Sequence, residues 1–289
     1  MDAVSRIERT LSASLDRVDS AGGPPLLAAA MRHAVFPKGA RVRPRLCLAV
    51  AAACGEDEPE ASVAAGAAIE LMHCASLVHD DLPCFDNADE RRGRASVQKQ
   101  YGAPLAVLAG DALIVLSFQV LGWGTERCLA RLPALVQILA GATGMPSGIA
   151  AGQAWECEPK IDLSQYQRAK TGALFSAATM AGAAAAGHDP AAWRALGEGL
   201  GEAYQVADDI ADVFAGETDL GKPVGQDAKF GRPNAALSMG IDGAMRHLAR
   251  LAQMAADSIP DCPGADMLKK LTLSESKRLL PKDLSQQAA

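Results

Sequence analysis

Carboxylates gather at two places in this sequence, and each place lies at the end of an apolar run. The first is "LVHDDLPCFDNADERRG" at 77–93, which holds five carboxylates, two adjacent arginines and a histidine. The second is "YQVADDIADV" at 204–213, where Asp208 and Asp212 share a helix face with Gln205. Like charges one turn apart repel, and burying them unpaired is costly. Each cluster therefore predicts either a solvated stripe or a bound cation.

Two equivalent clusters favour the cation. Asp80 and Asp81 end the first apolar run, and we expect Pro83 and the extra residues to bulge the turn so that Asp86 returns toward Asp80. Magnesium usually takes one or two carboxylates and completes its shell with water and phosphate oxygens. The two clusters, facing each other across a helical cavity, predict a magnesium site.

Cationic side chains for a phosphate group lie close to both clusters in the sequence. Arg91 and Arg92 directly follow the first cluster, and Lys222 in "LGKPVGQD" comes fourteen residues after Asp208. Lys170 lies in "AKTGALF". Side-chain cations and metal ions together can compensate the charge of a diphosphate. The sequence therefore predicts a diphosphate-binding site.

The elements that position these residues are predicted to be helices. Hydrophobic residues make up 49% of the chain and aromatic residues only 4%, so the core must be Ala, Leu and Val, which favour helices. We find no linker, composition shift or repeat, so residues 1–289 are predicted to form a single all-α domain packed around a central element. The predicted helices cover about 3–18, 26–35, 45–54, 61–83, 103–123, 129–150, 164–186, 190–214, 232–258 and 264–280.

Composition also argues against several classes of protein. A net charge of -6 and an isoelectric point near 5.4 argue against binding to nucleic acid. The weakly polar run at 172–187 is too short for a membrane span, and the N-terminus shows no apolar signal core. Seven cysteines without a C-x-x-C pair fit reduced thiols. We expect a cytoplasmic protein without membrane insertion.

Four segments together resemble the trans-prenyl diphosphate synthases, or polyprenyl synthetases. They are "HCASLVHDDLPCFDNADERRG", "KTG", "YQVADDIADV" and "LGKPVGQD", and they occur in the family's order and spacing between about 30 and 235. Within the family, the chain is most similar to the bacterial geranylgeranyl diphosphate synthases of carotenoid and bacteriochlorophyll pathways. The resemblance implies the isoprenoid synthase fold, a single large helical bundle around a central substrate cavity, and a homodimer.

The resemblance also implies an activity. It is that of a prenyltransferase, which condenses isopentenyl diphosphate head-to-tail with an allylic diphosphate (dimethylallyl, geranyl or farnesyl) to give trans-geranylgeranyl diphosphate. About three magnesium ions would bind the allylic diphosphate. Carried over by motif, the metal ligands are Asp80, Asp81, Asp86, Asp208 and Asp212, and the allylic diphosphate is held by Arg91, Lys170 and Lys222. Thr171 and Gln205 would lie near the allylic cation, and isopentenyl diphosphate would be held by Arg43, His73 and Arg92.

The two histidines in the first segment receive different assignments. His73 precedes Asp80 by two helical turns, so both project to the same side. A lone histidine in an apolar helix is more often a core residue, but its register with the motif favours substrate binding. His79 lacks this support and is predicted to be structural.

One segment departs from the family. The family commonly reads G-G-K-R-x-R-P near its start, and its lysine binds isopentenyl diphosphate. This chain reads "KGARVRP" at 38–44, with Ala40 at the position of that lysine. Arg41 and Arg43 remain, and Lys38 is a candidate to reach the same phosphate. We expect affinity for isopentenyl diphosphate to be weakened or rerouted rather than lost.

Product length in this family depends on what blocks the tunnel below the first aspartate cluster. Farnesyl-producing relatives often carry a bulky aromatic residue five positions before the first aspartate. Here Ala75 occupies that position and is followed by Ser76, so we expect a deeper tunnel. Phe118 is a candidate floor, although a core phenylalanine is equally expected there. The prediction is a twenty-carbon product.

Other interpretations remain open. A metal phosphohydrolase with a His–Asp dyad could use "HDD" at 79–81, but this leaves "DDIAD" and "LGKPVGQD" unexplained. A non-catalytic partner subunit typically loses aspartates from one cluster, and this chain keeps both. The remaining alternatives are a farnesyl diphosphate synthase and a terpene cyclase or head-to-head condensing enzyme on the same fold.

Overall fold

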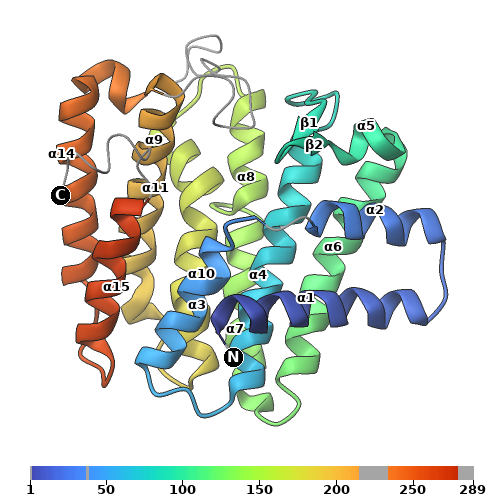
Figure 1. The fold of residues 1–289 in the computed structure, drawn as a ribbon, viewed down its shortest axis with the longest axis horizontal. Coiled ribbons are helices and arrows are strands. Elements are labelled where there is room, and N and C mark those ends of the chain that lie inside the picture. The colour runs from blue at the N-terminus through green and yellow to red at the C-terminus, as the bar shows by residue number, and fades with distance from the viewer. Residues whose placement is uncertain (1, 37–38, 215–233, 279–289) are drawn as a thin grey trace.

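The computed structural model describes residues 2–36, 39–214 and 234–278, which are mostly helical (Figure 1). Within this part the only strands are β1 (Glu90–Arg91) and β2 (Arg94–Ala95), which form one antiparallel hairpin. The predicted all-α fold is therefore confirmed. The helices are α1 (Ala3–Ser20), α2 (Pro25–Val35), α3 (Val42–Ala53), α4 (Pro59–Asp80), α5 (Val97–Tyr101), α6 (Ala103–Gly124), η1 (Leu129–Arg131), α7 (Leu132–Thr143), α8 (Ile149–Ala154), η2 (Trp155–Cys157), α9 (Leu163–Gln167), η3 (Arg168–Gly172), α10 (Ala173–Ala185), η4 (Ala191–Trp193), α11 (Arg194–Phe214), α14 (Ala235–Asp257) and α15 (Ala265–Arg278).

Helix α4 lies at the centre of the bundle. Every residue from Ala61 to Met72 is buried, and the helix packs against α3, α6 and α10. Its many alanines and its glycine let neighbouring helices approach on several sides, so it shows no single apolar stripe. Helices α1 and α2 cross the long helices at a steep angle in Figure 1. The central helix is thus held on several sides before it ends at the first acidic cluster.

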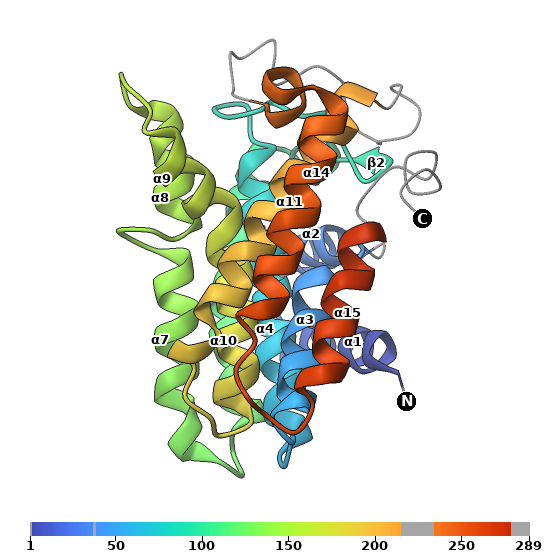
Figure 2. The ribbon, with the colours of Figure 1, turned by 90° about the vertical axis from the view of Figure 1, so that its left-hand side faces the viewer.

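A second wall of the bundle carries the other acidic cluster. Helix α10 packs against α3, α4, α7 and α11, and α11 packs against α14. Helices α14 and α15 lie side by side on the face shown in Figure 2. The carboxyl ends of α4 and α11 both lie toward the upper end of the bundle in Figure 1. The two acidic segments, more than a hundred residues apart, therefore meet at one end of the molecule.

Two local predictions were wrong, and one element was missed. The helix expected at 129–150 is broken at 144–148, where Pro146 between two glycines cannot continue a helix. The helix expected at 164–186 contains the π turn η3, in which the backbone widens for one turn. The hairpin β1–β2 was missed because strands of two residues carry no alternation that sequence reasoning could detect.

Two helices are long and apolar enough to span a bilayer if only length and composition are considered. In α4, 83% of the apolar window is buried inside the protein, as expected of a core helix. In α6 only 44% of the window is buried. The remaining side of α6 exposes Val107, Leu108 and Val115, and this feature needs a separate explanation.

Candidate active site

The first acidic cluster lies where α4 ends. Asp80 is the last residue of the helix and Asp81 is its C-cap. The chain then turns back, so that the backbone N–H of Asp86 donates to the carbonyl oxygen of Asp80 at 3.0 Å. The predicted return of Asp86 toward Asp80 is confirmed. The turn thus presents several carboxylates at one end of a buried helix.

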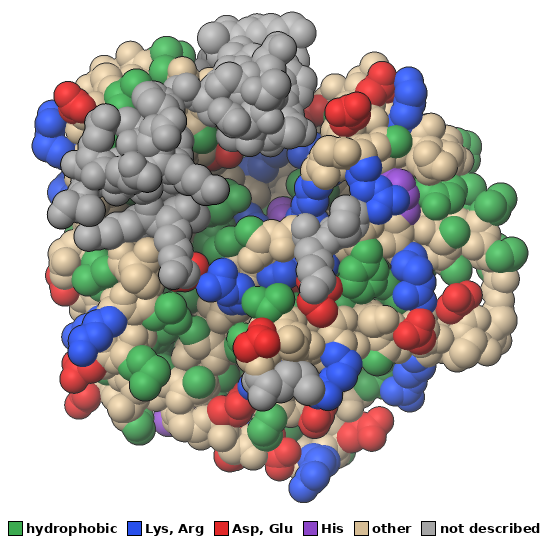
Figure 3. Space-filling model, in the orientation of Figure 1, with side chains coloured by type: hydrophobic (Ala, Val, Ile, Leu, Met, Phe, Trp, Pro, Cys, Tyr) green, Lys and Arg blue, Asp and Glu red, His purple; other side chains and the backbone are tan. Residues whose placement is uncertain are grey.

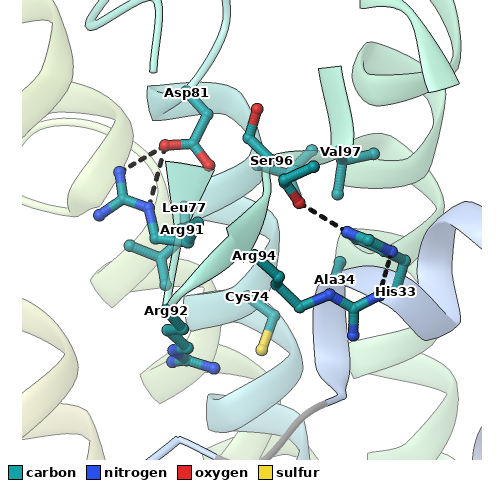
Figure 4. A pocket seen from close by; sticks show the side chains of 12 residues that line it. His33, Ala34, Cys74, Leu77, Asp81, Arg91, Arg92, Arg94, Ser96 and Val97 are labelled. Carbon is teal, nitrogen blue, oxygen red and sulfur yellow. Dashed lines mark hydrogen bonds and ion pairs between the residues drawn. The ribbon is translucent and has the colours of Figure 1, made fainter. Parts of the chain in front are cut away.

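Arg91 and Arg92 leave the hairpin in different directions. The Nε of Arg91 donates to Oδ1 of Asp81 at 2.9 Å (Figure 4). The guanidinium of Arg91 also lies 3.7 Å from Asp80. Burial raises the pKa of Asp81, although Arg91 opposes this shift. Arg92 points away from Asp81. Arg91 therefore neutralises the aspartates, whereas Arg92 remains available to another part of the site.

The hairpin that carries both arginines is fastened to α2. The Nε2 of His33 lies 2.7 Å from the carbonyl oxygen of Ala95, and its Nδ1 contacts the guanidinium of Arg94. The hydroxyl of Ser96 donates to the carbonyl oxygen of Ala88 at 2.7 Å. These residues border a small pocket of about 30 Å³ beside Asp81 and the arginines (Figure 4). The anchored hairpin fixes the direction from which the arginines enter the site.

Lys170 reaches the first acidic cluster from the π turn η3. Its Nζ lies 3.2 Å from Oδ1 of Asp80 and 2.5 Å from Oε1 of Glu156. Glu156 also accepts a hydrogen bond of 2.7 Å from the hydroxyl of Tyr166. Burial alone would lower the pKa of Lys170, but Asp80 and Glu156 raise it above its ordinary value, so the ammonium stays charged. Sequence reasoning missed Glu156, because a lone glutamate in "GQAWE" carries no visible motif.

Thr171, the next residue of the same turn, reaches the second acidic helix. Its hydroxyl donates to Oε1 of Gln205 at 3.0 Å, and Nε2 of Gln205 donates to Asp209 at 3.0 Å. Asp209 also accepts the backbone N–H of Ala235 at 2.8 Å, at the start of α14. Sequence reasoning singled out Asp208 rather than Asp209. The structure makes Asp209, which is buried, the residue that orients Gln205.

A second basic region lies around His73, two helical turns before Asp80 in α4. An Nη of Arg43 lies 3.4 Å from Nε2 of His73, and its guanidinium lies over the rings of Phe175 and Tyr204, at 4.6 and 5.8 Å from their centres. The buried Nε of Arg43 has no hydrogen-bond partner in the described part of the chain. Burial, followed by the charges of Arg43 and Arg92, lowers the pKa of His73 well below 6.5. Arg43 and His73, with the charge of Arg92 acting on both, thus form a basic cluster, and its assignment to isopentenyl diphosphate stays a prediction.

Arg41 does not join that cluster. Its guanidinium is buried, with Nε 2.9 Å from Glu8 and an Nη 2.6 Å from the buried Glu70. A third bond of 2.8 Å joins it to the carbonyl oxygen of Val35. Arg41 is therefore committed to the protein interior. Lys38, the other cation considered for this loop, lies outside the described residues, as does Lys222.

His79 faces away from the acidic cluster and toward α6. Its Nε2 lies 3.2 Å from the carbonyl oxygen of Val107 and 3.6 Å from Asp111. The ring occupies the space that a side chain at Gly110 would need. This placement agrees with a structural role for His79 and gives no support to a His–Asp dyad at 79–81.

The chain-length candidates lie in two different clusters. Ala75 is buried among residues of α1, α2, α4 and α6, whereas Phe118 packs with residues of α4, α7 and α10. The hydroxyl of Ser76 donates to the carbonyl oxygen of His73 at 2.8 Å. Met72, one turn before Ser76, is fully buried in the cluster of Phe118. The structure therefore adds Met72, which the sequence did not single out, to the residues beneath the site.

The acidic residues suit magnesium. No three His, Cys, Asp or Glu side chains in the described ranges are gathered closely enough to hold an ion by themselves. Magnesium needs only one or two carboxylates when waters and substrate phosphates complete its shell. The carboxylate oxygens are divided between two helices, with too few on either one to fill a metal shell. They therefore fit a metal that binds together with a diphosphate. The donors come from Asp80, Asp81 and Asp86 at the end of α4 and from Asp208 and Asp212 in α11.

Basic side chains surround the same end of the bundle. Figure 3 shows lysine and arginine side chains gathered around a hollow at the upper centre of the face it presents. The arrangement combines carboxylates for a metal with guanidinium and ammonium groups for phosphate oxygens. Such a site can bind two anionic substrates side by side and stabilise a leaving diphosphate.

Comparisons with known proteins agree with this geometry. A model of the polyprenyl synthetase family matches residues 24–261. The geranylgeranyl diphosphate synthases of Cereibacter sphaeroides and Rhodobacter capsulatus are each 50% identical, over 276 and 275 residues, covering 96% and 94% of both chains. A solved geranyltransferase from Helicobacter pylori, complexed with magnesium and isoprenyl diphosphate, matches with a TM-score of 0.77 at 27% identity, covering 95% of this chain and 97% of that chain. The chain belongs to the polyprenyl synthetase family.

Proposed function

We propose that this protein is a geranylgeranyl diphosphate synthase, which condenses isopentenyl diphosphate with allylic diphosphates head-to-tail. The observation that carries the proposal is the turn η3. Lys170 contacts Asp80 of α4 while the neighbouring Thr171 contacts Gln205 of α11, so one turn joins the two acidic helices. An allylic diphosphate at this junction would have carboxylates for its metals, an ammonium for its phosphate oxygens and polar oxygens near its reacting carbon.

The reaction follows from these groups. The C–O bond of the allylic substrate breaks, and its electron pair leaves with pyrophosphate. The double bond of isopentenyl diphosphate then forms a new C–C bond, and loss of a proton to the departing pyrophosphate restores a double bond. Lys170 and Arg91 stabilise the charge that develops on the leaving group, which is where positioned cations accelerate a reaction most. Arg43, His73 and Arg92 hold the second diphosphate.

Magnesium is the proposed cofactor, with about three ions per site. Asp80, Asp81, Asp86, Asp208 and Asp212 are the proposed ligands. When bound, magnesium supplies positive charge that stabilises the leaving diphosphate. The crystallised relative from Helicobacter pylori contains magnesium with isoprenyl diphosphate, which supports this assignment.

The proposed product has twenty carbons. Two relatives with 50% identity over nearly the whole chain carry the name geranylgeranyl diphosphate synthase. The small residues Ala75 and Ser76 below the first acidic cluster agree with a tunnel deep enough for this chain. The carotenoid and bacteriochlorophyll pathways are the proposed consumers, on the basis of the sequence resemblance stated above.

The proposed assembly is a cytoplasmic homodimer formed through α6. Val107, Leu108 and Val115 recur on one side of this helix and are 41%, 51% and 58% exposed. Exposed apolar side chains gathered on one side of a long helix mark a candidate contact surface. A second copy of the same helix would cover it symmetrically. This proposal accounts for the exposed side of α6 without insertion into a membrane.

The reaction class is tested by measuring pyrophosphate release from isopentenyl and farnesyl diphosphates. We expect release to require both substrates and magnesium, and to stop when EDTA is added. Asp208→Asn should lower the rate about 100-fold or more, because it removes one metal ligand. The exposed Asp261→Asn, a matched control, should keep full activity. Rapid release from farnesyl diphosphate alone would instead indicate a cyclase or hydrolase.

A further inference from the structure

We propose that Gly39 is a positioning residue for the isopentenyl diphosphate site, because only glycine leaves room for the guanidinium of Arg92 to lie against the backbone there. The inference rests on the proposed function and deepens it. It explains how a site with Ala40 in place of the family's lysine can still present a complete set of cations to the second diphosphate.

The space that a side chain at Gly39 would need is occupied by the guanidinium of Arg92, the movable end of that side chain. A Cβ atom built on Gly39 would lie 2.7 Å from Cζ of Arg92 and 2.8 and 2.9 Å from its two terminal nitrogens. Real Cβ atoms essentially never approach other atoms closer than 3.0 Å. All three atoms belong to one guanidinium, so the group as a whole lies against Gly39. Even the smallest side chain would push that group away.

Arg92 is held in this direction by an unusual backbone conformation. It has φ of 54° and precedes Gly93, with φ of 74°, in the two-residue turn of the hairpin. Turns of this kind prefer Asn, Asp or Gly at the first position, since other side chains strain the left-handed conformation. Strain of this kind persists where the surrounding structure demands a particular side-chain direction. Here the direction brings Arg92 to Gly39.

Arg92 is also a cation that no acid in the described part of the chain holds. It makes no hydrogen bond or ion pair with any described residue, unlike Arg91 with its bonds to Asp81. It lines the same small pocket as Cys74, the residue after His73 (Figure 4), and besides burial its charge contributes to lowering the pKa of both His73 and Arg43. Among the described residues, neither Arg92 nor Arg43 has a hydrogen bond or ion pair with a carboxylate, so these guanidinium groups, with the imidazole of His73, suit a multiply charged anion.

The loop that contains Gly39 is fixed from the other side. Arg41, two residues later, has φ of 50° and is tied to Glu8 and Glu70. Because these bonds are buried, the loop cannot easily retreat when a side chain is added at Gly39. The displacement would therefore fall on Arg92. A change at Gly39 should alter binding of isopentenyl diphosphate without touching the allylic site.

The test is steady-state kinetics of Gly39→Ala with isopentenyl and farnesyl diphosphates. We expect the KM for isopentenyl diphosphate to rise on the order of tenfold, while kcat and the KM for farnesyl diphosphate change less than about twofold. Gly23→Ala is the matched control, since a Cβ there meets nothing within 4 Å. Thermal unfolding of both variants shows whether they remain folded.

A double-mutant cycle identifies the partner. If Gly39 acts through Arg92, adding Gly39→Ala to Arg92→Ala should raise the KM for isopentenyl diphosphate less than about twofold further. An equal rise in both backgrounds would overturn the inference, and so would an unchanged KM in Gly39→Ala. Should Gly39→Ala fail to fold, Arg92→Lys replaces the flat guanidinium, and an unchanged KM would then overturn it.

Calorimetry separates this inference from the proposed function. Wild-type protein that binds isopentenyl diphosphate but releases no pyrophosphate would contradict the proposed function. The affinities of the wild type and of Gly39→Ala would still decide the role of Gly39, with about tenfold weaker binding expected for the variant. Wild-type protein that does not bind isopentenyl diphosphate would overturn both.

Discussion

At the residue scale, the two described cations of the allylic site, Lys170 and Arg91, are each held by specific acids. Lys170 lies between Asp80 and Glu156, and Glu156 is itself held by Tyr166. An ammonium on a flexible stem has many possible positions, so a fixed acceptor reduces the freedom lost when it binds a phosphate. Glu156 is therefore as much a part of the phosphate site as the lysine that it holds.

The change Glu156→Gln tests this arrangement. It keeps the shape but removes the charge next to Lys170, so we expect kcat/KM for the allylic diphosphate to fall about tenfold. Glu158→Gln, an exposed change two residues later, should have no effect. Equal activity in both variants would show that Lys170 needs no anchor. Steady-state kinetics at saturating isopentenyl diphosphate gives the comparison.

His73 provides a prediction about pH. Burial lowers its pKa well below 6.5, so in the folded protein it stays neutral while the unfolded chain takes up a proton as the pH falls below 6.5. The free energy of unfolding therefore does not depend on His73 above pH 6.5. Below pH 6.5 it decreases by up to about 1.4 kcal/mol per pH unit, because only the unfolded chain is protonated at this position.

The pH prediction is checked by urea unfolding between pH 5 and 8. His73→Gln should remove this part of the pH dependence, whereas the exposed His188→Gln should keep it. Parallel pH curves for the wild type and His73→Gln would mean that His73 becomes protonated in the folded state.

At the element scale, the geometry of the site is set by helices α4 and α11 and by the π turn η3, which contacts both of them. The sequence predicted both helices, because alanine-rich apolar runs have few alternatives to a helix. It also predicted that Asp86 returns to Asp80, since Pro83 stops the helix. It did not predict the π turn at η3, whose widened backbone follows from packing against α8 and α11.

The hairpin and its arginines were also beyond sequence reasoning. A two-residue strand has no periodicity, and the left-handed conformation of Arg92 contradicts the local preference of arginine. The sequence assigned Arg43 but not Arg41 to isopentenyl diphosphate, and it gave no sign that Arg41 faces Glu70. These features depend on contacts between distant parts of the chain, which a sequence pattern does not contain.

Helix α4 also carries the prediction on product length. Ala75→Phe adds a ring to α4 below Asp80, where the proposed tunnel runs, so we expect the main product to shorten to fifteen carbons. Phe118→Ala should have the opposite effect and allow longer chains if Phe118 forms the floor. Product sizing by chromatography checks both. An unchanged distribution in Ala75→Phe would show that the tunnel is limited elsewhere, with Met72 as the next candidate.

At the scale of the whole molecule, the exposed side of α6 is the feature that a monomer leaves unexplained. Val115→Glu introduces a charge at the centre of the proposed dimer contact, and we expect it to weaken dimerisation by at least about tenfold. Leu26→Glu, at a similarly exposed leucine in α2, should leave the assembly unchanged. Sedimentation equilibrium measures both, and a monomeric wild type would contradict the proposal.

The most direct measurement of the central claim is the length of the product. Purified protein would be incubated with magnesium, labelled isopentenyl diphosphate and dimethylallyl, geranyl or farnesyl diphosphate in turn, and the chains would be sized. We predict a magnesium-dependent twenty-carbon product from starters that the enzyme accepts. A product of fifteen carbons would contradict the tunnel depth but keep the reaction, and no condensation with any starter would contradict the proposed function.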